Sequence, residues 1–374
     1  MNDLPRSAAI RAGTGLVVAL AALLLMRLPA LRRLEDKVFD RRVLAWRQLS
    51  EADTSRIVLV TIDEESLHEL GLHWPLPRAS YARAIERLRK AGAEGIGVTV
   101  VFQGAGGDPA QTRALAAVVD GADDVVLASR IDAGSGASGF RCATGFCDVP
   151  LDEDGIARHF QVSPAGVDPP PVCLALAMLR ARYKNPTFTP RGFVDMGGAR
   201  FPISWAGPPG RTFTTIGLKR VLGGGDLSKE VKGAVVLLGS TLPGSANDIR
   251  TPFSKGGGRG DPMTALELTA NIVFTLMGSD ALITLTTAQH VLLVCGTAFV
   301  LFVLFCSLHP AFSVSVVCFV SVLYTLGAMY AMIESRWLLP VVAPLVAVQV
   351  AWFSSIAYRG VRAWMRASQR SGVA

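Results

Sequence analysis

The sequence predicts an α/β domain, with a mainly parallel sheet flanked by helices, together with an α-helical membrane domain of one N-terminal and three C-terminal transmembrane helices. Three observations support this fold class. Residues 281–333 contain no Asp, Glu, Lys or Arg, and a bilayer core needs roughly 20 apolar residues for each spanning helix. Residues 44–278 instead alternate short β-branched runs with helical segments, which is typical of βαβ units. Basic residues gather towards both ends of the chain, as they do beside membrane spans.

The C-terminal apolar block divides into three predicted spans. Its charge-free run is long enough for two helices, and Leu308-His309-Pro310 marks the turn between them. Glu334 and Arg336 interrupt the block before a further uncharged stretch that ends at Tyr358. The predicted transmembrane helices cover residues 288–308, 311–333 and 337–358. A buried helical hairpin in a soluble protein rarely lacks charges over such a length, so we interpret the chain as an integral membrane protein.

The N-terminal span is predicted from a shorter apolar run. Residues 12–26 are small or aliphatic and are bracketed by Arg11 and Arg27. The run extends to residues 10–28 if both arginines direct their charged ends towards the headgroups. A cleaved signal peptide has the same outline, but no small-x-small cleavage site follows this run. We therefore expect a retained signal anchor, preceded by a cytoplasmic tail over residues 1–9.

Charge at the chain ends predicts the topology. The tail at residues 359–374 holds four arginines and no acid, which favours a cytoplasmic C-terminus. Four spans then place the N-terminus in the cytoplasm and the domain at residues 31–280 outside it, with the protein in the inner (plasma) membrane. The basic residues between Arg27 and Arg42 oppose this orientation. The net charge of +7 arises from the basic residues that flank the predicted membrane spans. We therefore expect contacts with membrane lipids and no nucleic-acid partner.

Within the central domain, an amphipathic helix is predicted over residues 31–49, leading from the membrane into the domain. Continuous β-branched and aliphatic runs predict strands that are buried on both faces. Strands are predicted at residues 57–62, 95–102, 124–129, 156–162, 201–205, 211–214 and 235–239. Helices are predicted at residues 80–91, 109–119, 172–183 and 264–277. We expect residues 134–145 to form a loop, and the first and last strands to be neighbours.

Two cysteines lie close together in the central domain. Cys142 and Cys147 are separated by four residues near a glycine-rich segment. A disulfide between them would suit an oxidising compartment, while free thiols or metal ligation remain alternatives.

Three passages, taken together, resemble the type 2 CHASE domain, an extracytoplasmic sensory domain of bacterial signalling receptors. The first passage is Leu34-Glu35-Asp36 with Phe39-Asp40, similar to the helix that leads into that domain. The second is the strand at residues 57–62 with Asp63, followed by Gly71, Trp74-Pro75 and Pro77-Arg78. The third comprises Val236-Leu237-Leu238-Gly239-Ser240-Thr241, Gly244, Asp248, Thr251-Pro252 and Leu266-Glu267-Leu268-Thr269-Ala270-Asn271.

The resemblance implies a sensor followed by three membrane helices. Members of that family usually continue into a cyclase or a kinase, whereas this chain ends soon after Arg370. We therefore expect a separate cytoplasmic or membrane signalling partner. The chain also departs from the family at its second strand, Gly97-Val98-Thr99-Val100-Val101-Phe102, which lacks the aspartate that is often found there.

Ligands of a parallel sheet bind beyond the carboxyl ends of its strands. The ligand-binding candidates come from the ends of the first and last predicted strands and from the turns that resemble the type 2 CHASE domain. They are Asp63, Trp74, Arg78, Ser240, Thr241 and Asp248. A structural interpretation is also open, in which the Trp74-Pro75 turn shapes the chain and the serine and threonine cap a helix. We expect Arg78 and Asp248 to lie within hydrogen-bonding distance of each other.

Catalytic chemistry finds little support in the sequence. The loop from Gly239 to Gly244 has no lysine before its serine, which argues against a nucleotide phosphate loop. His68 and His73 match no compact metal-binding spacing. We expect no enzyme activity, no cofactor and no metal. The predicted function is a membrane-anchored sensor of an extracytoplasmic ligand or envelope protein, and the alternative is a structural or assembly subunit of an envelope complex. A homo-oligomer is compatible with both.

Overall fold

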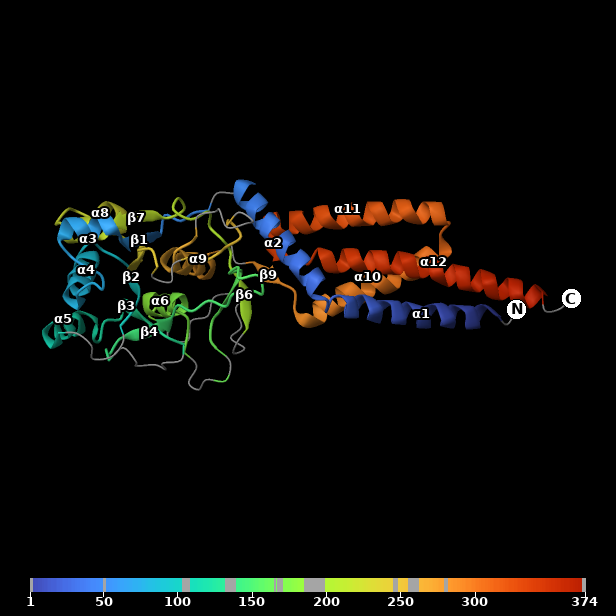
Figure 1. Ribbon diagram of the computed structural model, residues 1–374, viewed down its shortest axis with the longest axis horizontal. Helices are drawn as coiled ribbons and strands as arrows, with labels where there is room; N and C mark the ends of the chain where they lie inside the picture. Colours follow the sequence, from blue (N-terminus) through green and yellow to red (C-terminus); the bar gives the residue numbers. More distant parts are fainter. Residues whose placement is uncertain are drawn as a thin grey trace. The chain divides into compact units, whose positions relative to one another are not determined.

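The computed structural model describes residues 3–49, 52–102, 108–131, 139–164, 166, 171–184, 199–244, 248–254, 262–278 and 282–371 (Figure 1). The chain divides into two compact units. One, here called the helical unit, is formed by residues 1–42 and 282–374, and the other, the α/β unit, by residues 43–281.

The α/β unit is built on a six-stranded parallel sheet with the strand order β4-β3-β2-β8-β1-β7. Its strands are β1 (Ile57–Ile62), β2 (Gly95–Val101), β3 (Val125–Ser129), β4 (Ala143–Phe146), β7 (Thr214–Gly217) and β8 (Val235–Ser240). Strand β8 lies between β1 and β2, with Ile57 and Gly95 both in register with Val235. The first and last predicted strands are therefore neighbours, as expected. Every residue of β1, β3 and β8 is buried, since helices cover both faces.

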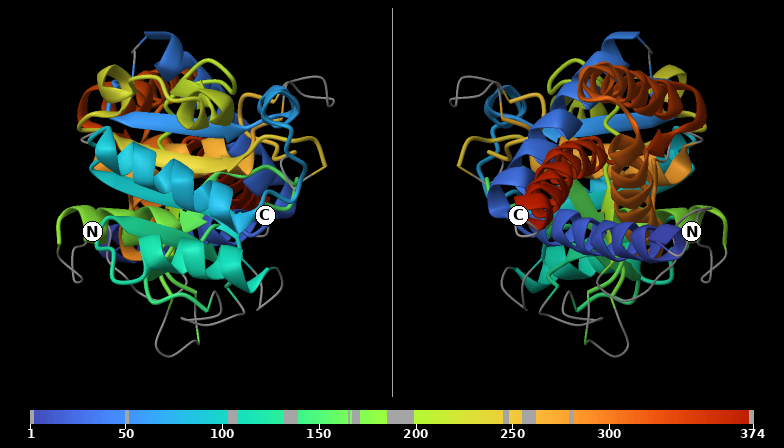
Figure 2. Two further views of the ribbon diagram at one scale, coloured as in Figure 1. Left: turned by 90° about the vertical axis from the view of Figure 1, so that its left-hand side faces the viewer. Right: turned by 90° about the vertical axis from the view of Figure 1, so that its right-hand side faces the viewer.

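Helices form a layer on each face of this sheet. One layer consists of α3 (Glu64–Leu70), α4 (Arg78–Lys90), α5 (Pro109–Val119) and α7 (Leu218–Leu222), whose apolar side chains join one buried core with the sheet. The other layer contains α6 (Leu174–Arg182) and α9 (Ala265–Met277). Figure 2 shows α4, in cyan, crossing in front of the strands in its left view. The short helix α8 (Ser228–Val231) and the antiparallel pair β5 (His159–Gln161) and β6 (Arg200–Pro202) complete the unit.

Several of these elements differ from the sequence prediction. Helices α3, α7 and α8 were not predicted, and β7 begins at Thr214, where the strand predicted at residues 211–214 ends. Strand β4 occupies part of the segment expected to be a loop, because pairing with β3 stabilises an extended run that contains a glycine and little apolar surface of its own. Helix α3 depends on its ends, where Asp63 caps the first turn and Gly71 takes the left-handed conformation that ends the helix.

The helical unit contains α1 (Asp3–Leu25), α2 (Pro29–Leu49, up to Arg42), α10 (Thr287–Ser307), α11 (Pro310–Ser335) and α12 (Val342–Ser371). Three of its helices, α10, α11 and α12, are long and apolar enough to cross a membrane. The pair α1 and α2 passes the same test only when joined across a 72° bend, which allows up to four spans. Helices α1, α10 and α12 pack around a common apolar core (Figure 1).

The last helix begins later than the uncharged stretch suggested. Trp337 and Leu338 form β10, which pairs in parallel with β9 (Ile283–Thr284), and α12 starts at Val342. The reason is Pro340, since the residue before a proline is disfavoured in helical conformation. Side chains on the outside of α11, such as Phe312, Leu323 and Leu326, are 58–70% exposed. Large apolar side chains exposed along a whole helix are expected where lipid is the solvent.

Candidate functional site

The carboxyl edge of the central strands brings three of the candidate residues together. Ile62 of β1 is in register with Ser240 of β8, so Asp63 and Thr241 follow at the same edge. The Thr241 backbone N–H donates to the Ile62 carbonyl over 3.1 Å. The Ser240 hydroxyl accepts a hydrogen bond of 3.2 Å from the Leu242 backbone N–H.

Asp63 has a structural role in this arrangement. Its carboxylate accepts hydrogen bonds from the Ser66 backbone N–H at 2.7 Å and from the Thr61 hydroxyl at 2.9 Å. Partial burial acts to raise the pKa of Asp63, but these hydrogen bonds outweigh it and lower the pKa below its usual value. Asp63 is therefore ionised at neutral pH and holds the first turn of α3.

Among the described residues, no hydrogen bond or ion pair joins the other three candidates to this group or to one another. Arg78, at the start of α4, donates to the Thr112 hydroxyl of α5 at 2.7 Å, and its guanidinium lies 5.9 Å from the ring centres of both Phe102 and Phe140. Trp74 is 40% exposed. These contacts direct Arg78 towards α5.

Asp248 is exposed and immediately precedes a segment that bridges to Ile156 and Met263. The expected pair between Arg78 and Asp248 is not formed, both residues being within the described ranges. The expectation was wrong because the two residues belong to different neighbourhoods: Arg78 packs against α5, whereas Asp248 follows the bridged segment. Ligand binding by the six candidates stays a prediction.

The α9 stretch that contributed to the family resemblance has a clear structural purpose. Glu267, Asn271 and Thr275 are spaced by four residues and so lie on one face of the helix. Their side-chain oxygens accept hydrogen bonds from the backbone N–H groups of Gly210, Ala206 and Ser204, at 2.6, 2.8 and 2.9 Å. This polar row satisfies the backbone of an irregular segment, so the helix fixes residues 204–210 beside it.

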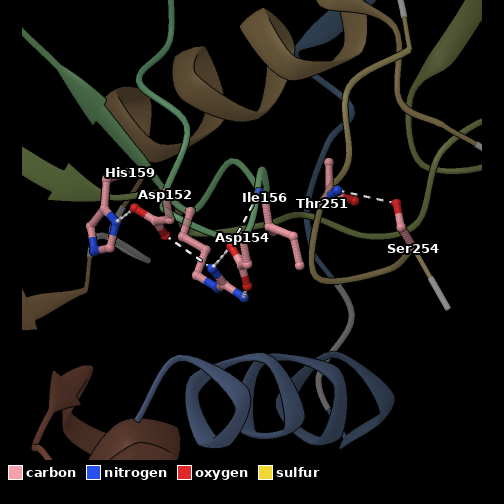
Figure 3. A network of polar contacts seen from close by, with 7 residues as sticks. Asp152, Asp154, Ile156, His159, Thr251 and Ser254 are labelled. Atoms are coloured by element: carbon pink, nitrogen blue, oxygen red, sulfur yellow. Dashed lines mark hydrogen bonds and ion pairs between the residues drawn. The ribbon is translucent and has the colours of Figure 1, made fainter. Parts of the chain in front are cut away.

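A buried arginine, which no sequence pattern indicated, organises the loop before β5. Arg158 is 1% exposed. It pairs with Asp154 at 2.8 and 2.9 Å and with Asp152 at 3.1 Å (Figure 3). The Nδ1 atom of His159 lies 3.5 Å from Asp152. We call Asp152, Asp154 and Arg158 the buried ion network, after the buried Arg158 at its centre; Asp152 is half-buried and Asp154 is exposed.

The two aspartates of this network have depressed pKa values. For Asp152, burial acts to raise the pKa, but the nearby His159 ring and the hydrogen bond from Arg158 outweigh it and lower the pKa. For Asp154, hydrogen bonds from Arg158 are the main cause of the lowered pKa. The network also anchors its loop to the segment after Asp248, because the Ala157 backbone N–H donates to the Arg250 carbonyl at 2.9 Å.

The cysteines do not form the expected disulfide. Cys142 and Cys147 are free thiols located before and after β4. A strand rises about 3.3 Å per residue, which separates the pair by roughly 16 Å, whereas bonded cysteines have Cα atoms about 4.4–6.8 Å apart. Burial raises the pKa of Cys142 to about 11 and that of Cys147 to about 12, so both thiols stay protonated at neutral pH. No group of three metal-ligating side chains occurs among the described residues.

In the helical unit, Glu35 caps the start of the last helix. Its carboxylate accepts hydrogen bonds from the backbone N–H groups of Val341, Val342 and Ala343 at 2.7, 2.8 and 3.4 Å. These N–H groups belong to the turn where α12 begins, whose donors have no partner within the helix. The helix dipole also favours a negative charge at this position. One residue of α2 therefore holds the N-terminus of α12.

Arg42, which lies seven residues after Glu35 on the same helix, reinforces this attachment. It is 8% exposed and donates to the carbonyl of Leu339 at 2.7 Å and to that of Ala328, in α11, at 2.9 Å. The Tyr324 hydroxyl of α11 donates to the Pro340 carbonyl at 2.6 Å. Glu35, Arg42 and Tyr324 form what we call the α2 clamp, which ties α2 to α11 and to the start of α12.

Comparison with known families agrees with this architecture. The family model of the CHASE2 domain matches residues 17–308, which is most of the chain. The chain belongs to the CHASE2 domain family. CHASE2 is an extracellular sensory domain of signalling receptors with membrane-spanning helices. Comparison with curated proteins and with solved structures gave no match.

Family membership and the apolar helices define the protein in outline. This CHASE2 protein is a membrane protein with an extracytoplasmic sensory domain, and three candidate transmembrane helices follow that domain towards the C-terminus. The Glu35 passage, noted in the sequence for its resemblance to the family, supplies the carboxylate of the α2 clamp. Sequence reasoning found the passage but not its partner.

Proposed function

We propose that this CHASE2 protein senses a ligand or an envelope protein outside the cytoplasm of a bacterial cell and passes that state across the inner membrane to a separate cytoplasmic partner. It does so without a catalytic step of its own. The observation that supports this proposal is the α2 clamp. Helix α2 continues in sequence into the α/β unit, and its Glu35 carboxylate holds the first turn of α12. A displacement of α2 would therefore reach the helix that carries the basic tail.

The topology on which this proposal depends is open to a direct test. In a cysteine-free background, we expect Arg130→Cys to react with a membrane-impermeant maleimide in intact cells, and Arg366→Cys to react only after permeabilisation, because the arginine-rich tail favours the cytoplasm. Both positions are exposed. Ser254→Cys should label as Arg130→Cys does, although Ser254 accepts a hydrogen bond from Thr251. Labelling of the Arg366→Cys variant in intact cells would show that the protein has the opposite orientation in the membrane.

The partner is tested by photo-crosslinking in living cells. A photoreactive amino acid at Trp364, which lies in α12 and is 70% exposed, should capture a discrete cytoplasmic protein. The same probe at Leu323, which is 58% exposed on α11 within the predicted span, serves as the matched control and should capture lipid. If the probe at Trp364 captures no protein while the probe at Leu323 still crosslinks, the result would contradict transmission to a separate partner.

One feature favours the second candidate function, an assembly subunit. Strand β4 is an outer strand of the sheet, and within the described part of the chain only its last residue, Phe146, is bridged on that side, to Cys173. Beside the strand lies an open cavity of about 730 Å³ lined by Ala143, Thr144 and the basic residues Arg141, Arg180 and Lys184. Outer strands pair readily with an extended segment of another protein. A photoreactive probe at Thr144 that captures an abundant envelope protein, while the probe at Trp364 captures none, would favour assembly over sensing.

A further inference from the structure

Three arginines of the helical unit lie near the end of α10. Arg11 belongs to α1, and Arg359 and Arg362 belong to α12. All three act electrostatically on the thiol of Cys306, near the end of α10. Arg359 is fixed in place by a hydrogen bond of 2.7 Å from its Nη1 atom to the Leu308 carbonyl. Arg359 therefore contacts the end of α10 directly, and Arg11 and Arg362 lie near enough to influence the same thiol.

The same place holds hydrogen-bonding atoms that are buried but unpaired. Arg11 Nε, Arg359 Nη2 and the Tyr358 hydroxyl are shielded from solvent and have no hydrogen-bond partner among the described residues. Tyr358 is part of the cluster, since its ring lies 5.6 Å from the Arg362 guanidinium and 5.8 Å from the Phe302 ring. Buried donors are nearly always paired in proteins, so three in one cluster point to an acceptor that the chain itself does not provide.

No carboxylate balances this positive charge within the described residues. The sequence has no acid after Glu334, and α10 has none. In α1 the only acid is Asp3, at its first residue, whose side chain lies outside the described part. Two other clusters in the molecule behave differently, since Arg158 is matched by two aspartates and Lys219 by Glu65 and Glu69. An external anion is the remaining source of neutralisation.

A phosphate is the anion that best fits these donors. Guanidinium groups bind phosphate oxygens in a bidentate manner, and a phosphodiester offers acceptors to two arginines and a hydroxyl at once. The cluster lies at the end of α10, next to the apolar surfaces of membrane helices, where Leu16 of α1 and Leu304 of α10 are 65% and 42% exposed. Such surfaces suit acyl chains and offer nothing to a soluble anion.

We propose that Arg11, Tyr358, Arg359 and Arg362 form a binding site for the headgroup phosphate of an anionic phospholipid. The acyl chains of this lipid lie along α1 and α10. The site joins α1 to α12 through the lipid, and the basic tail places it in the cytoplasmic leaflet, where anionic headgroups attract arginines.

The experiment uses the full-length protein in nanodiscs that contain equal amounts of phosphatidylcholine and phosphatidylglycerol, followed by native mass spectrometry. We expect the wild-type protein to retain phosphatidylglycerol selectively. The double variant Arg11→Gln with Arg359→Gln should lower the ratio of retained phosphatidylglycerol to phosphatidylcholine roughly tenfold or more, because two charge-assisted contacts are lost. Arg366→Gln is the control for the loss of an arginine charge, since it removes one charge from an exposed position of α12 and should leave the ratio unchanged. Each single variant, Arg11→Gln or Arg359→Gln, removes the same charge as this control and should lower the ratio.

Three results would overturn the proposal. An equal loss with Arg366→Gln would show general surface attraction, and a wild-type protein without preference would show that no site exists. Displacement of the retained lipid by inorganic phosphate would assign the site to a soluble anion. If the double variant fails to fold, Arg359→Lys is the substitute test, because it keeps the positive charge but loses the planar guanidinium that binds phosphate in a bidentate manner. The ratio of retained phosphatidylglycerol to phosphatidylcholine should then fall. An unchanged ratio would contradict the site.

Discussion

Replacing Arg158 with methionine is expected to destabilise the α/β unit by about 3–5 kcal/mol, the usual cost of removing one partner from a buried ion pair. The buried ion network explains this size. Arg158 is 1% exposed, and its loss strands mainly Asp152, whose side chain is 13% exposed. The Asp154 side chain is 37% exposed, so water compensates for part of its lost contact. Chemical unfolding of the purified protein, followed by tryptophan fluorescence, measures the change in the free energy of unfolding.

Arg141→Met provides the matched control for this prediction. The Arg141 side chain is 91% exposed and lies 3.6 Å from Asp120. An exposed pair of this kind contributes at most about 1 kcal/mol. If Arg158→Met costs no more than Arg141→Met, the network does not stabilise the fold.

Acid should reveal the same network in the wild-type protein. The pKa values of Asp152 and Asp154 are lowered in the folded state from the ordinary 3.8. A depressed pKa gives stability that is fully present above the unfolded pKa and is lost as the pH falls through the folded one. We therefore expect stability to decrease below about pH 4, and this acid dependence to be smaller in Arg158→Met. An identical dependence in both proteins would assign it to other carboxylates.

The second large effect is expected for Glu35→Gln, which should loosen the start of α12. The substitution keeps the shape of the side chain but removes its charge and one acceptor oxygen, while three backbone N–H groups depend on that carboxylate. Hydrogen bonds to charged groups contribute about 1.5–3 kcal/mol each. We expect amide hydrogen exchange at Val341 and Val342 to accelerate roughly tenfold or more.

Glu334→Gln is the control for this exchange experiment, since Glu334 is an exposed acid at the end of α11. Exchange at Val341 and Val342 should be unchanged in that variant. The proposed function adds a second measurement: the protein captured by the photoreactive probe at Trp364 should change in amount in Glu35→Gln. Unaltered exchange together with unaltered capture would remove the α2 clamp from the transmission pathway.

The sequence determined the features that depend on local composition. The charge-free run from residue 281 to 333 was enough to predict α10 and α11, because a membrane helix must be apolar along its own length. The bounds of β1 and α5 were predicted at both ends, since each has an unbroken pattern and a clear boundary at Asp63 or Pro109. The mainly parallel sheet and the family followed from the order of such segments.

The tertiary structure decided everything that depends on partners distant in the sequence. Glu35 caps a backbone N–H group 306 residues away, and no local pattern encodes that distance. Arg78 and Asp248 looked like partners because both lie in matched passages, yet packing on α5 gives Arg78 different neighbours. The burial of Arg158 and the pairing of β4 were likewise invisible, because a charge or a short strand is stabilised by what the fold places around it.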